Sequence, residues 1–252
     1  MIKLLPLLLL LPTTVTAFAA NSSPRNKSTA LKAEQARQPW EFGRFVKQSS
    51  KFVSLPNPFR RSSNEVKIEP GEILWTPSSS SFSFGPLDDV VMGGVSSSNF
   101  DNDSGSWKGT VTDANNGGFI GIRSFPAFQW DMQSCQGIEL KLKGGQGKRF
   151  KVVLRDSAEF NGICWTTSID VGEASFMKLF NKQSGDGVTT VRIPFQKQIP
   201  TLFAKTVPNE TFNKQSVVGV QVALSKFEYD GDLNPKFALG DVELQILEIK
   251  AY

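Results

Sequence analysis

The residues whose types and spacing could support chemistry are concentrated in one short segment, residues 88–98. Asp88 and Asp89 offer two adjacent carboxylates, groups that elsewhere act as general acid and base or hold a cation. Neighbouring residues of an extended chain point to opposite sides, so these two are poorly placed to share one proton or one ligand. A turn in which both carboxylates accept backbone hydrogen bonds is the preferred interpretation. We predict no catalytic residue, no metal ligand and no cofactor in this chain.

Two other patterns suggest ligand loops but fall short of them. Gly93-Gly94 lacks both the spacing and the following helix of a phosphate-binding loop. Residues 230–234 resemble the first half of a calcium loop, but Pro235 stands where that loop requires glycine, and no flanking helices are indicated. We expect a turn at residues 230–234, and calcium at the rim of the domain stays open as an alternative.

Composition argues against most enzyme classes. The chain has 252 residues and no histidine, which removes the usual general base, the usual zinc ligand and the common nucleophilic triads. An enzyme that uses carboxylates alone is the weaker hypothesis, and we predict that the protein is not an enzyme. Residues 18–70 carry ten Lys/Arg and four Glu, whereas residues 71–252 carry 17 Lys/Arg and 20 Asp/Glu. The mildly acidic remainder makes nucleic acid an improbable partner.

The two cysteines, Cys135 and Cys164, are too few for a disulfide scaffold. One bridge remains open, but two buried thiols in neighbouring strands are the favoured interpretation. Cys164 lies in the apolar sequence Ile-Cys-Trp with no nearby cation, so we expect an unreactive thiol.

Phe119 and Arg123 lie four residues apart, and hence on one face of a predicted strand. One interpretation is core packing for Phe119 and a solvated strand end for Arg123. The other is a groove with an aromatic wall and a cation that holds a carboxylate or a sugar hydroxyl. The tryptophans of residues 72–252 are expected in the core rather than on an exposed platform.

The N-terminus is predicted to be a targeting sequence. Residues 1–17 have the basic start, apolar stretch and small residues of a secretory signal peptide, and residues 18–33 have the composition of a transit peptide. This pair resembles the two-part presequence of plastid proteins in algae with secondary plastids. We therefore expect a plastid location, with the mitochondrion and secretion as alternatives. Residues 34–71 are predicted to be a basic linker that docks by its aromatic residues, with Phe42, Phe45 and Val46 on one face of a short helix.

Residues 72–252 show the period-two alternation of antiparallel strands, which predicts one buried face and one wet face. Apolar residues alternate with polar ones over residues 138–143, 150–155 and 242–246, and the pattern slips by one at Leu247, as a β-bulge would cause. Residues 144–147 are expected to form a hairpin turn. Short strands with glycine-rich turns and no long helical pattern predict an all-β, antiparallel β-sandwich of jelly-roll type.

An ordered set of motifs carries a family resemblance. The set is DDVVMGGVSSS at residues 88–98, WKG at 107–109, GGFIGIRS at 117–124, GIELKLKG at 137–144 and VRIPF at 191–195. With these motifs the chain resembles the complex I intermediate-associated protein 30 family over roughly residues 74–250. The resemblance implies a galactose-binding-like jelly roll and a non-enzymatic assembly factor for a membrane redox complex.

The resemblance also implies the partners and the site. The partners would be protein subunits of a respiratory complex of complex I type, or of a photosynthetic complex in a plastid, with membrane association that is peripheral at most. The residues that match the family signature form a predicted partner-binding surface: Asp88, Asp89, Met92, Gly93, Gly94, Ser96, Gly118, Phe119 and Arg123. The alternative function is a secreted carbohydrate-binding module.

Overall fold

The computed structural model describes residues 42–50, 52, 65–78, 82–125, 128–159, 162–172, 181–183 and 187–252. The chain divides into two units, Met1–Gln35 and Ala36–Tyr252. The predicted signal and transit segments lie outside the described residues. Among the residues that are described, no helix is long and apolar enough to cross a membrane.

The elements follow one another from an N-terminal helix into a long series of strands. In chain order they are α1 (Phe42–Ser50), β1 (Val66–Lys67), β2 (Ile73–Trp75), β3 (Ser83–Pro86), the 3-10 turn η1 (Asp89–Met92), β4 (Ser97–Asp101), β5 (Ser106–Val111), η2 (Ala114–Asn116), β6 (Phe119–Phe125), β7 (Trp130–Asp131), β8 (Gly137–Gly144), β9 (Arg149–Arg155), β10 (Cys164–Asp170), β11 (Asn181–Gln183), β12 (Val188–Pro194), η3 (Phe195–Lys197), β13 (Ile199–Leu202), β14 (Lys205–Thr206), β15 (Gly219–Ser225) and β16 (Gly240–Ala251).

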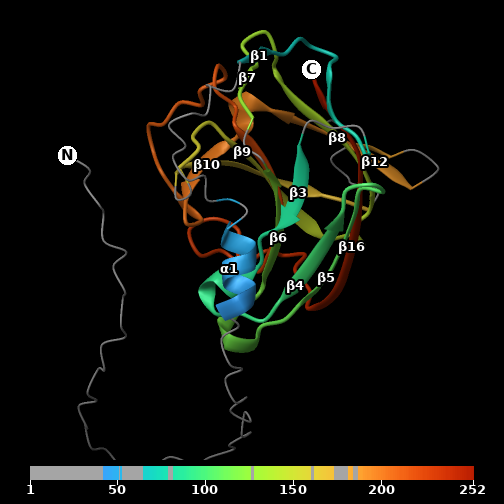
Figure 1. Ribbon diagram of the computed structural model, residues 1–252, viewed down its shortest axis with the longest axis vertical. Helices are drawn as coiled ribbons and strands as arrows, with labels where there is room; N and C mark the ends of the chain where they lie inside the picture. Colours follow the sequence, from blue (N-terminus) through green and yellow to red (C-terminus); the bar gives the residue numbers. More distant parts are fainter. Residues whose placement is uncertain are drawn as a thin grey trace, which may run out of the picture. The chain divides into compact units, whose positions relative to one another are not determined.

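The strands form two sheets that face each other (Figure 1), which confirms the predicted sandwich. The β9 sheet has the order β14-β13-β10-β9-β15-β6-β3, and the β8 sheet has the order β11-β12-β8-β16-β5-β4, with β2 also paired to β16. All pairings within these sheets are antiparallel, and the short pair β1 with β7 is parallel. Because β2 and β16 pair, the two ends of the sandwich domain lie together.

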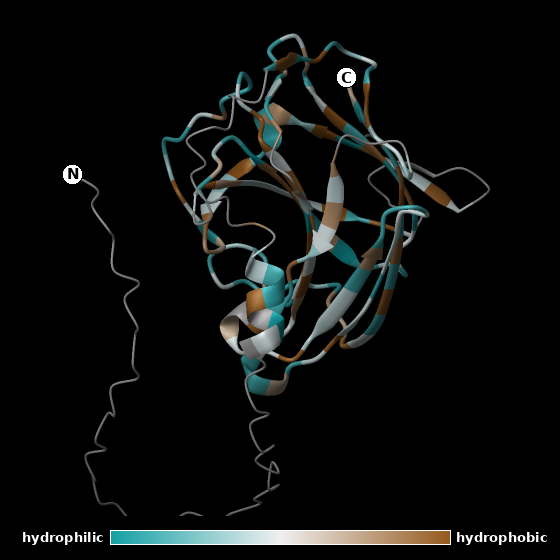
Figure 2. Cartoon of the chain, in the orientation of Figure 1, coloured by the Kyte–Doolittle hydropathy of each residue, from teal (hydrophilic) through white to brown (hydrophobic). Residues whose placement is uncertain are grey.

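The core lies between the two sheets and is built by the predicted alternation. Apolar and polar residues alternate along the strands in Figure 2, and the inward-facing residues of β8 and β9 are fully buried. The four tryptophans of the domain, Trp75, Trp107, Trp130 and Trp165, are all buried, as expected. The bulge in the last strand is confirmed by a register shift between Ile246 and Glu248 where β16 pairs with β8.

The expectation of a wet outer face is wrong for β9. Lys151, Val153 and Arg155 alternate with the core residues and are nevertheless buried. The Lys151 ammonium donates to the backbone carbonyls of Phe227 (2.7 Å) and Glu228 (2.6 Å), so the loop after β15 covers this face. A central strand whose outer face is covered by loops loses the exposure that period-two patterning predicts.

The predicted hairpin at residues 144–147 is also wrong. β8 pairs with β12 and β16, whereas β9 pairs with β10 and β15, so this turn carries the chain from one sheet to the other. All four residues have positive φ, including Gln146 at 52°, and this run bends the chain across the sandwich. The turn expected at residues 230–234 is confirmed, and the Asp230 carboxylate accepts from the amide and the hydroxyl of Thr206.

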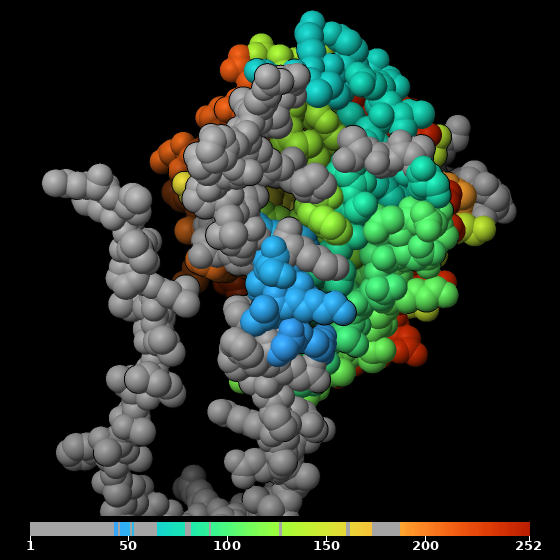
Figure 3. All heavy atoms as spheres, in the orientation of Figure 1, coloured from blue at the N-terminus to red at the C-terminus, as the bar shows by residue number. Residues whose placement is uncertain are grey.

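Residues assigned to the linker contribute to the same compact unit as the sandwich. The predicted short helix is present as α1, in which Val46 is exposed, and the side chains of Phe42 and Phe45 lie outside the described residues. Phe52 packs edge-on against Phe125 with ring centroids 6.1 Å apart. In Figure 3 the blue atoms of α1 lie on one face of the molecule beside green atoms of the region of β4 and β5.

Candidate functional site

The segment richest in candidate residues forms a tight turn that begins with Asp88 in an extended conformation. The 3-10 turn η1 follows and ends at Gly93, which has a φ of 88°. The Gly93 amide donates a hydrogen bond to the carbonyl of Val90 (3.1 Å). Val90 is buried and fixes the turn to the core, while the side chain of Met92 is 83% exposed. The turn therefore presents one methionine from a rigid base.

Asp89 holds this turn against the neighbouring strands. It is 2% exposed, and its Oδ1 accepts from the Ser96 amide (3.0 Å) while its Oδ2 accepts from the amides of Gly118 (2.9 Å) and Phe119 (3.3 Å). Gly94 packs directly on the carboxylate: a Cβ atom at Gly94 would lie 2.3 Å from the Cγ of Asp89. Both oxygens of Asp89 are consequently used by main-chain donors.

Asp88 holds a different set of groups. It is fully buried, its Oδ1 accepts from the Ser98 hydroxyl (2.6 Å), and its Oδ2 accepts from the Ser98 amide and from Nε2 of Gln48 (both 2.9 Å). The Gln48 carbonyl oxygen accepts in return from the Asp88 amide (3.0 Å), and Arg44 lies 3.8 Å from Oδ2. Asp88 thus fastens α1 to the sandwich, an arrangement visible in Figure 1 where α1 lies beside η1.

The two carboxylates point at different partners, as their adjacency predicts. No group of three or more acidic or cysteine side chains within the described ranges is placed to hold a metal ion. The structural role of the pair in a turn is therefore what the geometry supports.

Asp88 also makes stability depend on pH. Burial raises the pKa of Asp88 above its ordinary 3.8, against the effect of its hydrogen bonds from Ser98 and Gln48. The folded state then holds this proton more tightly than the unfolded chain. The protonated Asp88 carboxyl therefore contributes to the stability of the fold below pH 3.8. This contribution is lost as the pH rises through the raised pKa of Asp88 in the folded state.

We expect the variant Asp88→Asn, which does not titrate, to gain stability relative to the native chain as the pH rises. The measurement is urea unfolding of both proteins at several values between about pH 3.5 and pH 7. A difference in unfolding free energy that stays constant over this range would contradict the raised pKa.

The other predicted surface residues fall into two groups. Gly94, Ser96, Gly118 and Arg123 are buried, whereas Gly93 and Phe119 are half-buried. Phe119 and Arg123 do share the outer face of β6, as their spacing predicts, since they pair with Ser225 and Gln221 of β15. The whole set as a partner-binding surface stays a prediction.

The interpretation of Arg123 as a solvated strand end is wrong. Its guanidinium carbon lies 5.5 Å from the ring centroid of Phe52, and the residue is 8% exposed. Burial, and secondarily the positive charge of Arg155, lowers the pKa of Arg123 to about 10.

Sequence reasoning missed two sets of partners. Arg44 and Gln48, which are four residues apart on one helix face, both reach Asp88, and that spacing was the available signal. The absence of a cation near Cys164 is also wrong, because Nη1 of Arg155 lies 3.3 Å from its sulfur. Both cysteines are free thiols, and Cys135 lies in the turn before β8 rather than in a strand.

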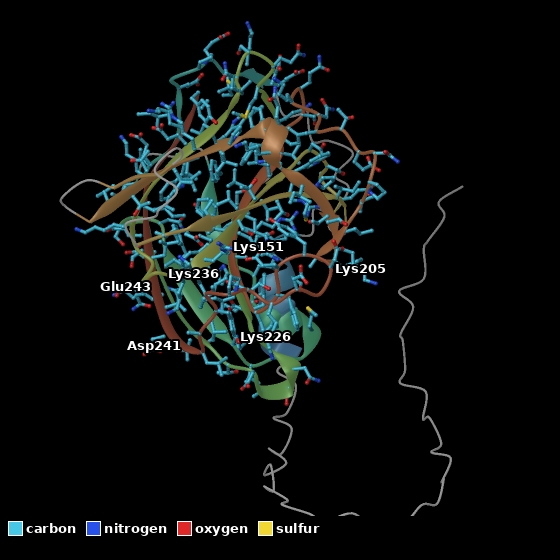
Figure 4. The ribbon with its side chains drawn as sticks, turned by 180° about the vertical axis from the view of Figure 1, so that it is seen from behind. Lys151, Lys205, Lys226, Lys236, Asp241 and Glu243 are labelled. Carbon is cyan, nitrogen blue, oxygen red and sulfur yellow. The ribbon has the colours of Figure 1, made fainter. Side chains whose placement is uncertain are left out.

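A shallow groove of about 530 Å³ lies on the outer face of the β8 sheet. It is lined by Ser97, Ser98, Asn99, Lys108, Gly109, Thr110, Gln146, Asp241, Val242 and Glu243. Asp241 and Glu243, labelled in Figure 4, project from β16, where Asp241 accepts from Thr110 (2.8 Å) and Glu243 pairs with Lys108 (3.1 Å). The polar side chains of this groove therefore pair with one another at an exposed surface.

Comparison with known proteins gives one family match. The model of the family described as Complex I intermediate-associated protein 30 (CIA30) matches residues 74–246, which are most of the sandwich. No curated protein matches the chain.

Among solved structures, the family 11 carbohydrate-binding module from Clostridium thermocellum, in complex with a β-1,3-1,4-mixed-linked tetrasaccharide, is 15% identical. It covers 67% of this chain and 94% of its own length at a TM-score of 0.34. The family 11 module of the cellulosomal cellulase Lic26A-Cel5E of Clostridium thermocellum gives the same identity and coverages at a TM-score of 0.32. Likenesses at this level carry no functional argument.

Proposed function

The chain belongs to the complex I intermediate-associated protein 30 family, and from that premise we propose that it is a non-enzymatic assembly factor that binds assembly intermediates of an organellar membrane redox complex. The family implies a role associated with complex I assembly, and therefore protein partners. The client we propose is a respiratory complex of complex I type, or a photosynthetic complex if the protein resides in a plastid.

At the level of residues, the observation that supports this proposal is the hydrogen bonding of the two candidate carboxylates. All four carboxylate oxygens of Asp88 and Asp89 accept hydrogen bonds from groups of the chain itself. A general acid or base must reach the proton of a substrate, and neither buried carboxylate does. The turn exposes Met92, a flexible and polarizable side chain of a type enriched at protein interfaces.

We expect Met92→Glu to reduce capture of the client about tenfold or more, because a charge replaces an apolar contact of the proposed surface. Met92 is exposed, so the free energy of unfolding should change by less than about 0.5 kcal/mol. The measurement is the yield of client subunits that co-purify with the tagged full-length protein from organelle membranes, quantified by mass spectrometry.

The matched control is Leu239→Glu, an exposed apolar residue of the loop before β16. It should leave the yield unchanged. Equal yields from the native protein and the Met92→Glu variant would remove Met92 from the proposed surface.

We further propose that the protein reaches a plastid through the signal peptide at residues 1–17 and the transit-like segment at residues 18–33. The sequence pattern of these residues supports this, with the mitochondrion and secretion as alternatives. A fluorescent fusion of the full-length chain is expected inside the plastid, and fluorescence in the medium or the mitochondrion would overturn this location.

A further inference from the structure

A cysteine and two arginines gather on the outer face of the β9 sheet. Arg155 ends β9, Cys164 begins β10 and Arg123 lies on β6. Arg155 is 2% exposed, and its guanidinium donates through Nη1 to the sulfur of Cys164 (3.3 Å) and through Nη2 to the carbonyl of Glu159. Cys164 itself is half-buried.

The strands on both sides of β9 position Arg155. β9 and β10 are antiparallel neighbours, and the pair Leu154 with Trp165 sets Cys164 beside Arg155. On the other side Arg155 lies opposite Gly219 of β15, and the Cβ and Cδ atoms of Arg155 would be only 3.8 Å from a Cβ atom at that glycine. The side chain of Arg155 therefore lies between Gly219, which has no side chain, and the thiol of Cys164.

Nε is the third nitrogen of this guanidinium. It is buried and has no hydrogen-bond partner among the residues that the structure describes. A buried donor without a partner is destabilising. The oxygen of an oxidised Cys164 would lie beside Nη1, the nitrogen that already contacts the sulfur.

We propose that Cys164 is an oxidisable thiol that a peroxide converts to a sulfenate, whose oxygen is held by Arg155. In this step the Cys164 sulfur, as the thiolate, attacks one oxygen of hydrogen peroxide. The S–O bond forms and the O–O bond breaks, so the sulfur is oxidised and the peroxide is reduced. The departing hydroxide takes up a proton and leaves as water. This site goes beyond the proposed assembly role and does not depend on it.

Cys135 provides a control within the same chain. It is 1% exposed, its sulfur donates to the carbonyl of Ile68 (3.4 Å), and burial raises its pKa. A buried thiol with a raised pKa is a poor nucleophile. The two cysteines should therefore differ in reactivity as long as the protein is folded.

The test treats the purified full-length protein with hydrogen peroxide and dimedone, which traps sulfenates, and measures the labelling rate of each cysteine by mass spectrometry. We expect Cys164 to label at least about tenfold faster than Cys135. The difference should disappear in denaturant. Equal rates in the folded protein, or labelling of Cys135 alone, would overturn the proposal.

Variants of Arg155 test its part in holding the oxygen. Arg155→Gln should lower the labelling rate of Cys164 about fivefold or more, since the charge-assisted hydrogen bond to sulfur is lost. The labelling rate of Cys135 reports whether the variant is folded. If Arg155→Gln exposes Cys135, the same comparison is made with Arg155→Lys, which keeps the charge but not the paired donors. An unchanged Cys164 rate in a folded variant would contradict the role of Arg155.

Discussion

Replacing Asp89 by asparagine is expected to lower the free energy of unfolding by about 3 kcal/mol, whereas the same replacement at Asp88 should cost less than about 1 kcal/mol. Both oxygens of Asp89 accept from backbone amides, so an asparagine NH₂ group faces an N–H donor whichever way it is turned. The Oδ1 of Asp88 instead faces the Ser98 hydroxyl, which can accept from an NH₂ group. The oxygen of the asparagine then accepts the hydrogen bonds from the Ser98 amide and from Gln48, as Oδ2 of Asp88 does.

The measurement is urea unfolding of the two single variants at neutral pH. Asp241→Asn, at an exposed position on β16, is the control and should change stability by less than about 0.5 kcal/mol. Equal losses at Asp88 and Asp89 would mean that the hydrogen bonds described for the two carboxylates are wrong.

Replacing Gly94 by alanine should cost about 3 kcal/mol, because the new methyl group overlaps the Asp89 carboxylate and forces it from its donors. Gly93 is the matched comparison. A Cβ atom there meets nothing within 4 Å, so Gly93→Ala should cost only the strain of its positive φ, about 1 kcal/mol.

A double-mutant cycle isolates the cause of the Gly94 effect. In an Asp89→Ala background the atoms that a Cβ at Gly94 would meet are gone, so Gly94→Ala should add less than about 1 kcal/mol. Additive losses from Asp89→Ala and Gly94→Ala would show that the glycine is required for another reason.

These predictions give the family-signature segment a physical meaning. Its acidic and glycine residues hold a turn in place. Among the side chains of this segment that the structure describes, Met92 is large and exposed, and it is the one we propose as a contact to another protein. A catalytic interpretation would require a carboxylate that is free to exchange protons. The described contacts of Asp88 and Asp89 leave neither carboxylate free for that role.

The sequence was sufficient for the inward-facing positions of the strands, whose burial follows a local rule. The buried apolar positions within residues 138–143 and 150–155 and the slip in β16 all depend on period two, which is a property of neighbouring residues. The exchange between sheets at residues 144–147 was not predictable in this way, because glycine-rich turns serve hairpins and sheet crossings alike.

The missed parts of the site depend on contacts between distant segments. Asp88 binds Gln48, which lies 40 positions earlier in the chain, and Lys151 is buried by a loop more than 70 residues later. Arg155 meets Cys164 only because β9 and β10 pair in one register. Residue types and spacing identify candidates, but strand pairing decides which of them face solvent and which face one another.

The central claim is that this protein serves the assembly of a membrane redox complex by binding. Its most direct test is the abundance of assembled complexes, resolved by native gel electrophoresis of organelle membranes from cells that lack the protein. We predict that one redox complex is depleted while a subcomplex of it accumulates, and that the native chain restores the assembled form. Normal abundance of every respiratory and photosynthetic complex in those cells would contradict the claim.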